Sequence, residues 1–155
     1  MLFTDGSVDP NSKVGCGAYL ILTRLDVSLE DIQSQVEIKR FNCTTSTKLE
    51  LQTLLWALKE LDKTKDRIEI YTDCQTILQL PQRRQSLETS DYRSKSRKLL
   101  SNHELYKQLY TEFDQLDYLI IKVKGHKVTR EKNQIDHLFA LVDKAARKAL
   151  RGLQI

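Results

Sequence analysis

Hydrophobic and polar positions change their spacing along this chain, and each change predicts a different element. Residues 18–25 are rich in branched and aromatic side chains, and residues 35–43 alternate apolar and polar positions at a period of two. Both patterns favour β-strands. Leu2 and Phe3 belong to an earlier buried strand, and the turn residues after it predict a hairpin: Asp9, Pro10, Asn11, Gly15 and Gly17. Three antiparallel strands are therefore expected to open the chain.

A helical period begins at residue 46. Leucines recur at steps of three and four residues through 46–63, which gives one apolar helical face with Ser46 or Thr47 as the expected N-cap. Further patterns predict, in order, strand 67–73, a short helix 75–80 stopped near Pro81, helix 103–116, strand 117–125 and helix 133–152 ending near Gly152.

The order of these elements predicts an α/β fold. A helix between two strands usually forms a right-handed crossover that makes the two strands parallel. Because the first three strands are expected to be antiparallel, the complete sheet is expected to be mixed, with helices packed on it.

Acidic residues follow two of the predicted strands and begin one helix. Asp5 and Asp73 each come after a threonine at the end of a strand, and the carboxyl ends of neighbouring parallel strands are where open α/β sheets build their sites. Glu50 lies in the first turn of the first long helix. Each acid also has an ordinary explanation, since Asp-Gly is a common turn dipeptide and an acid suits the start of a helix.

A gathered set of acids needs a cation, because like charges repel and raise each other's pKa. Sites made only of oxygen ligands select hard ions such as Mg²⁺ or Mn²⁺. Two such ions about 3.5 to 4 Å apart can activate a water and stabilise the leaving oxygen of a phosphoryl displacement. Hydrolysis of a phosphodiester is therefore the expected chemistry.

Composition limits the class of protein. The chain has 155 residues, of which 40% are hydrophobic, and this matches a single compact domain over 1–155. No apolar run approaches the roughly eighteen residues of a membrane span, so we expect a soluble, cytoplasmic protein with no membrane partner. Cys16, Cys43 and Cys74 are widely spaced, which argues against a disulfide framework or a zinc site. A monomer is the default expectation.

The net charge of +4 comes from one basic block. From Pro81 to Ser101 the chain carries six Lys or Arg against two Asp or Glu, and the rest of the chain balances to zero. Such a block suggests contact with a polyanion, with a solvated loop surface as the equal alternative.

Five fragments, in this order, resemble the type 1 ribonuclease H family: FTDGS, TKLEL, IYTDCQ, VKGH and VDKAARKAL. The resemblance covers nearly the whole chain. It implies a ribonuclease H-like five-stranded mixed sheet in the order 3-2-1-4-5 with flanking helices. It also implies cleavage of the RNA strand of an RNA/DNA hybrid, with two Mg²⁺ ions as the expected cofactor and Mn²⁺ as a possible replacement.

The resemblance assigns roles to individual residues. Asp5 matches the first-strand acid that bridges the metals in the family, Glu50 matches the helix acid, and Asp73 matches the acid that ends the fourth strand. His126 matches a mobile histidine thought to assist proton transfer or product release.

The fourth metal-binding acid is open between two residues. Asp136 stands ten residues after His126, a spacing common in the family, whereas Asp143 begins DKAARKA, which is closer to the family's wording around that acid. Asp143 is favoured. Because the two lie seven residues apart, they share nearly the same helix face, and the sequence does not decide between them.

Substrate contacts are expected from hydroxyl, amide and basic side chains. Ser46 and Thr47 stand where many family members have paired asparagines, so hydroxyls would be offered to the sugar or base edge. The other candidates are Ser7, Gln75, Arg83, Arg84, Arg93 and Lys95. The basic candidates fall where some members carry a basic protrusion, and phosphate contacts there would give salt-sensitive affinity with little sequence preference.

The main hypothesis is an endoribonuclease that acts on RNA/DNA hybrids by a two-metal mechanism. One alternative is a related nuclease that cuts DNA or structured RNA. Another is a nucleic-acid-binding module that has the same fold without the chemistry. The intact set of acids argues against that module, because like charges gathered without a metal are costly.

Overall fold

The computed structural model describes residues 1–25, 27–63, 66–124 and 133–153. Its strands are β1 (Leu2–Asp9), β2 (Val14–Ile21), β3 (Glu37–Phe41), β4 (Ile68–Thr72) and β5 (Tyr118–Lys122). Its helices are α1 (Leu29–Gln33), α2 (Ser46–Glu60), α3 (Gln75–Thr89), α4 (His103–Phe113) and α5 (Gln134–Gly152).

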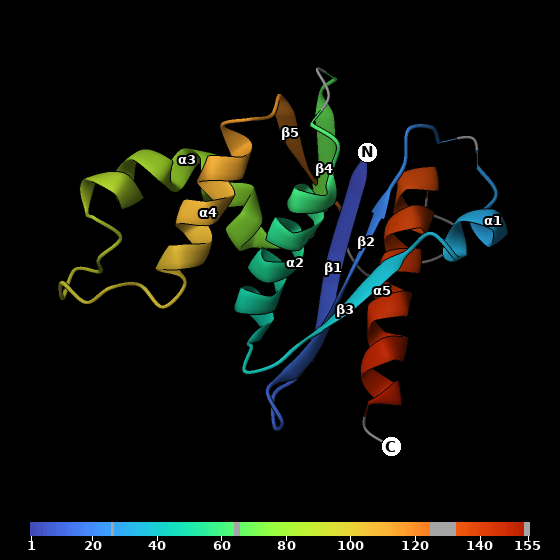
Figure 1. Cartoon of the computed structure of the whole chain (residues 1–155), viewed down its shortest axis with the longest axis horizontal. Coiled ribbons are helices and arrows are strands. Elements are labelled where there is room, and N and C mark those ends of the chain that lie inside the picture. The colour runs from blue at the N-terminus through green and yellow to red at the C-terminus, as the bar shows by residue number, and fades with distance from the viewer. Residues whose placement is uncertain (26, 64–65, 125–132, 154–155) are drawn as a thin grey trace.

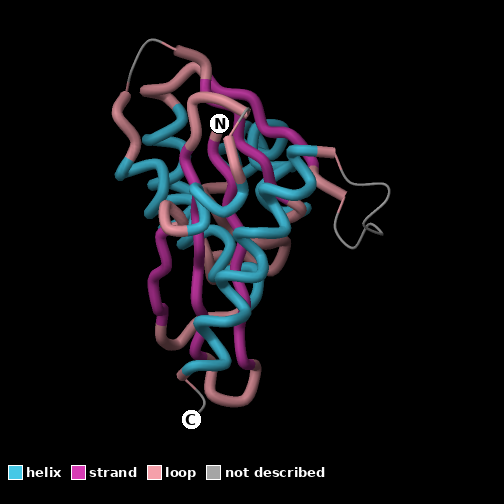
Figure 2. The backbone as a smooth tube through the Cα atoms, turned by 90° about the vertical axis from the view of Figure 1, so that its right-hand side faces the viewer, coloured by secondary structure: helices cyan, strands magenta, loops and turns pink. Residues whose placement is uncertain are grey.

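The strands form one mixed sheet in the order β3-β2-β1-β4-β5, which confirms the predicted fold (Figure 1). The three strands nearest the N-terminus pair antiparallel, and β4 pairs parallel with both β1 and β5. Figure 2 shows the long β1–β2 hairpin running to the end of the molecule where the C-terminus also lies.

Helices cover both faces of the sheet and enclose two hydrophobic cores. Leu2 packs with α2, α3 and α4, whereas Phe3 packs with α1 and α5. These neighbours point to opposite faces because side chains alternate along a strand. Strand β1 is therefore buried on both sides. No helix in the described part of the chain is both long and apolar enough to cross a membrane.

Helix α2 lies unusually close to the hairpin because glycines face it. A Cβ on Gly6 would lie 2.8 Å from Leu49 Cδ2, and a Cβ on Gly17 would overlap the Thr53 hydroxyl. Gly15 and Gly17 thus belong to β2, and the prediction that they are turn residues is wrong. What the sequence presents as loop chemistry is a requirement for close approach of helix to strand.

Helix α3 continues through Pro81, so the prediction that it stops there is wrong. A proline inside a helix costs about 3 kcal/mol. Leu80 and Leu87, on either side of it, are buried in the same core, and Tyr110 Oη donates to the Leu80 carbonyl oxygen at 2.7 Å. Tertiary packing therefore keeps the helix intact to Thr89.

Smaller differences have similar causes. The N-cap of α2 is Thr45, whose side chain accepts the Lys48 N–H at 3.3 Å, rather than Ser46 or Thr47. The short helix α1 was not predicted, because five residues are too few to show a helical period. It is held by Ile32, which is buried in the core beneath α5.

Candidate active site

Asp5 lies where the two central strands separate. The parallel pairing of β1 with β4 ends at Phe3 and Tyr71, while β1 continues to Asp9 as the antiparallel partner of β2. Asp5 therefore lies inside a strand. The prediction that it lies at the end of a strand is wrong. The separation of the strands leaves an opening in the sheet beside Asp5, so side chains from both faces can meet there.

Glu50 reaches this opening from the first turn and a half of α2. Its carboxylate accepts the backbone N–H of Gly6, the residue after Asp5, and hydrogen-bonds to the Asp5 side chain. Glu50 as a residue is only half-buried, but its Oε2 atom is buried. The glycine at position 6 permits this arrangement because it lets Leu49, and with it Glu50, approach the strand.

Asp73 completes a compact cluster. It follows β4 directly and is exposed, and one carboxylate oxygen from each of Asp5, Glu50 and Asp73 lies within 4.8 Å of the others. The three acids come from a strand, a helix and a strand end that are separated by up to 68 positions in the sequence. The structure thus brings together three of the predicted site residues.

The two candidates for the fourth acid occupy different environments. Asp143 hydrogen-bonds to Asp5 and forms an ion pair with Arg147, one helical turn on, at 2.9 Å. Asp136 lies about 10 Å earlier along α5, given a rise of about 1.5 Å per residue. Its Oδ2 accepts the Asn133 N–H at 3.1 Å in a capping box that begins the helix. Asp143 therefore contacts the three-acid cluster through Asp5, whereas Asp136 caps the start of the helix.

Burial and mutual repulsion perturb these carboxyl groups strongly. Burial, followed by the charge of Glu50, raises the pKa of Asp5 to about 10, and its hydrogen bond to Asp143 adds to the rise. Burial raises the pKa of Glu50 to about 7, against hydrogen bonds from Asp5 and Gly6 that lower it. The protein alone therefore holds the cluster partly protonated at neutral pH.

The donor set fits a hard divalent cation. All the gathered ligand atoms are carboxylate oxygens, which suit Mg²⁺ or Mn²⁺ rather than a soft metal. Among the described residues none hydrogen-bonds to the buried Glu50 Oε2 atom, so it has an unused acceptor at the cluster. A cation bound here would satisfy that oxygen and offset the repulsion that holds protons on Asp5 and Glu50.

Polar candidates for substrate contact surround this cluster, whereas His126 lies outside the described residues. Ser7 is two residues after Asp5 and so faces the same side of the sheet. Ser46 and Thr47 are exposed at the start of α2, and Gln75 is exposed at the start of α3. The structure gives each of them solvent access near an acid of the cluster, and their contact with substrate stays a prediction.

The predicted basic contacts divide into two kinds. Arg84 pairs with Asp114 and with Glu88, and its guanidinium lies 5.0 Å from the centre of the Tyr110 ring. It therefore joins α3 to α4. Arg83 lies over the Tyr106 ring at 5.8 Å.

The other two basic candidates lie on the loop between these helices. Arg93 donates to the Arg97 carbonyl oxygen, and both Arg93 and Lys95 are exposed. This loop extends from the body of the protein (Figure 1). Arg93 and Lys95 are thus better placed than Arg84 to meet a phosphate.

Sequence reasoning missed one contributor, the backbone of Gly6. The Gly6 N–H that binds Glu50 had no signal beyond the common Asp-Gly dipeptide, because a backbone donor leaves no trace in composition. The pairing of Arg147 with Asp143 is instead indicated by the sequence, since their spacing of four residues places the two side chains together on a helix.

The fold and the carboxylate cluster define an α/β protein of the ribonuclease H-like class. The family model for RNase H matches residues 1–150, so the chain belongs to the RNase H family. Membership of this family supports a nuclease that hydrolyses phosphodiester bonds.

Two relatives and one solved structure are similar to this chain. The chain is 26% identical over 141 residues to the ribonuclease H of Clostridium botulinum strain Hall, which covers 89% of this chain and 91% of that protein. A second type A strain of the same species gives the same figures. A chain from the structure of the foamy viral protease-reverse transcriptase in complex with dsDNA has a TM-score of 0.66 at 15% identity, covering 94% of this chain and 92% of that one. At this identity the last similarity concerns the fold alone.

Proposed function

We propose that this protein is an endoribonuclease that hydrolyses the RNA strand of RNA/DNA hybrids with the help of two divalent cations, Mg²⁺ in the first place. The observation that carries the proposal is the meeting of Asp5, Glu50 and Asp73 within 4.8 Å. Family membership supplies the reaction class. The relatives carry the name ribonuclease H, and the hybrid substrate is proposed from the resemblance to that family.

Asp5, Glu50, Asp73 and Asp143 would hold the ions. Asp5 hydrogen-bonds to both Glu50 and Asp143, so its carboxylate would be the ligand in contact with the other acids of the set. When bound, divalent ions activate a water, stabilise the leaving oxygen and bind the scissile phosphate. Asp5 and Glu50 must give up their protons on loading, since only the carboxylate forms bind a cation.

Discrimination of RNA from DNA requires contact with the 2′-hydroxyl. The exposed hydroxyls of Ser46 and Thr47 and the amide of Gln75 flank the acids and offer the donors and acceptors for this contact. Arg93 and Lys95 would bind phosphates of the duplex further from the cut. His126 is proposed, by resemblance to the family, to assist proton transfer or product release.

The test is cleavage of an end-labelled RNA/DNA hybrid with Mg²⁺ and with Mn²⁺, beside single-stranded RNA, duplex RNA and duplex DNA. The parent should cut only the hybrid, and only its RNA strand. Asp73→Asn should lose at least about 100-fold in rate, because metal ions contribute several kcal/mol to such reactions.

The matched control is Asp62→Asn, which removes an exposed acid at the far end of α2 from Glu50. It should cut like the parent. Folded parent protein that binds the hybrid and cuts it with neither metal would overturn the proposal and favour a binding module. Preferential cutting of duplex DNA or duplex RNA would instead show a related nuclease.

A further inference from the structure

Helix α5 carries a row of basic side chains on its exposed side. Lys144, Arg147, Lys148 and Arg151 stand at steps of three, one and three residues, a spacing that places them on one helical face. All four are exposed, and residues 144–153 contain no acid. The row spans about 10 Å, which equals about three phosphates along one nucleic-acid strand. We call these four residues the α5 basic row.

The helix dipole does not account for the whole row. A basic residue in the last turn of a helix is favourable, and Arg151 has that position. The dipole effect fades within one turn, so it gives no reason for Lys144 and Arg147 in the middle of α5. The ion pair with Asp143 accounts for Arg147, but it leaves Lys144 and Lys148, which lie four residues apart as like charges and repel each other.

The row begins at the candidate active site. Arg147 is paired with Asp143, and Asp143 hydrogen-bonds to Asp5. From this point the row runs toward the C-terminal end of the helix. A nucleic-acid strand with one phosphate at the carboxylate cluster would therefore have the α5 basic row directly beside its next phosphates.

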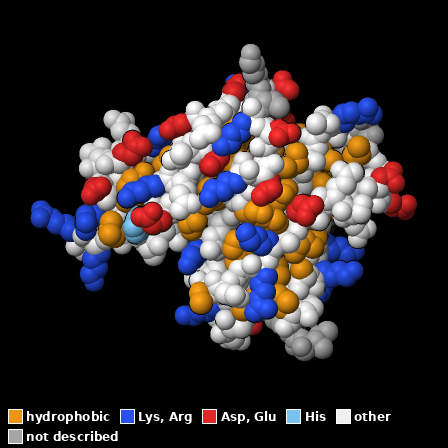
Figure 3. Space-filling model, viewed as in Figure 1, with side chains coloured by type: hydrophobic (Ala, Val, Ile, Leu, Met, Phe, Trp, Pro, Cys, Tyr) orange, Lys and Arg blue, Asp and Glu red, His pale blue; other side chains and the backbone are white. Residues whose placement is uncertain are grey.

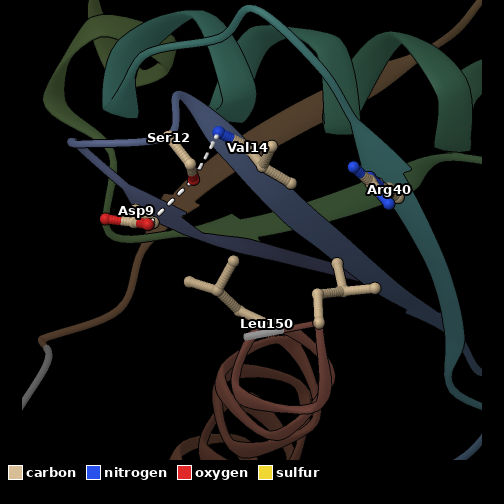
Figure 4. A pocket seen from close by; sticks show the side chains of 6 residues that line it. Asp9, Ser12, Val14, Arg40 and Leu150 are labelled. Atoms are coloured by element: carbon tan, nitrogen blue, oxygen red, sulfur yellow. Dashed lines mark hydrogen bonds between the residues drawn. The ribbon is translucent and has the colours of Figure 1, made fainter. Parts of the chain in front are cut away.

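Arg40 of β3 widens the surface. It lines a pocket of about 460 Å³ between the hairpin, β3 and the end of α5, together with Leu150, Leu153 and Val14 (Figure 4). Arg40 Nε donates to Asn42 Oδ1 at 3.0 Å. Asp9, the acid of this pocket, already accepts the Asn11 N–H and the Ser12 hydroxyl. Arg40 places a fifth positive charge near the end of α5, in a pocket that also holds the negative charge of Asp9.

The row lies on the other side of the molecule from the basic loop after α3. In Figure 1 that loop is at the far left and α5 is at the right, and Figure 3 shows Lys and Arg side chains over the lower half of α5. The cluster draws Asp73 from the start of α3 and Asp143 from α5. The two basic surfaces thus extend from the cluster in opposite directions.

We infer that the α5 basic row, with Arg40, is a second nucleic-acid contact that binds the phosphate backbone of the duplex on the side of the cut opposite to the basic loop. The inference rests on the proposed function, because it takes the scissile phosphate to lie at the cluster. An acidic protein segment is the less favoured occupant, since it would give no reason for the row to start beside Asp143.

The test is the salt dependence of hybrid binding, measured by anisotropy in EDTA so that no cleavage occurs. The variant Lys148→Gln plus Arg151→Gln removes two charges of the row while leaving the Arg147–Asp143 pair intact. The slope of log K against log salt should fall in magnitude by about 0.9 for each side chain that contacts a phosphate. Affinity should fall several-fold at low salt, and the loss should shrink as salt rises.

The matched control is Lys59→Gln plus Arg67→Gln, which removes the same two residue types near the C-terminal end of α2 and just before β4, where Arg67 forms an exposed pair with Asp117. It should keep the parent's slope. Equal slopes for the two double variants would overturn the inference. Cleavage of the same hybrid by the parent in Mg²⁺ tests the proposed function separately. A parent that cuts the hybrid while both double variants keep its slope would overturn the inference about the α5 basic row alone.

Discussion

Gly17 of β2 lies directly beneath Thr53 of α2, so close that a Cβ at position 17 would overlap the Thr53 hydroxyl. Thr53 is fixed in turn, because its Oγ1 donates to the Leu49 carbonyl oxygen at 2.7 Å. Leu49 immediately precedes Glu50. The contact between strand and helix therefore sets the position of a carboxylate that belongs to the candidate active site.

Gly17→Ala is expected to push α2 away from the sheet. Overpacking of this kind costs about 1 to 3 kcal/mol, and the displacement of Glu50 should lower cleavage further than the loss of stability explains. Thermal unfolding and cleavage of the hybrid by the folded variant measure the two effects. The control is Gly152→Ala, where no atom lies within 4 Å of the new Cβ. It should be as active as the parent and up to about 1 kcal/mol more stable.

Metal-free protein is expected to lose stability as pH rises. The pKa of Glu50 is raised to about 7 and that of Asp5 to about 10, so the folded protein binds more protons than the unfolded chain does. Stability contributed by these protons is complete below about pH 4 and is lost as pH rises through 7 and then toward 10. Thermal unfolding in EDTA, measured at several pH values between pH 5 and pH 9, follows this loss of stability.

Magnesium should reverse the trend. Because binding releases protons, the stabilisation by a fixed Mg²⁺ concentration should grow as pH rises across the same interval. Asp73→Asn should reduce this stabilisation. The control is Asp5→Asn, whose stability should depend less on pH. If the metal-free parent showed the same pH dependence as this variant between pH 5 and pH 9, the raised pKa of Asp5 would be contradicted.

Substitution of the two acids of α5 should have different effects, one on stability and the other on cleavage. Asp136→Ala breaks the capping box and should cost about 0.5 to 2 kcal/mol of stability while the folded variant keeps its activity. Asp143→Asn keeps the helix and should lose at least about 100-fold in cleavage rate. Unfolding and single-turnover cleavage of both variants provide the comparison. Full activity in Asp143→Asn together with inactivity in folded Asp136→Ala would reverse the assignment.

Substitution of Arg84 should affect stability, whereas substitution of Lys95 should affect the salt dependence of hybrid binding. Arg84→Gln removes the pairs with Asp114 and Glu88, and an exposed pair contributes at most about 1 kcal/mol, so stability should fall slightly while the salt slope of hybrid binding stays unchanged. Lys95→Gln should leave stability unchanged and lower the slope by about 0.9. The opposite pattern would make Arg84 the phosphate contact.

Local sequence was sufficient for most of the elements and for their order. The leucine spacing of 46–63 is a strong helical signal because apolar positions recur on one face over about four turns. Helix α2 forms over this segment. The three strands at the start and the helices between later strands fix the mixed sheet, since crossovers are right-handed. Asp5, Glu50 and Asp73 could be proposed as partners from strand and helix ends together with the resemblance to the family.

Only the tertiary structure decided the details that depend on contacts between distant residues. Helix α3 passes Pro81 because core packing on both sides outweighs the local preference to stop. Gly15 and Gly17 are strand residues because α2 needs the space above them. Asp136 and Asp143 share a helix face in the sequence pattern, but only Asp143 lies beside the point where β1 leaves β4, and that separation is a property of the whole sheet.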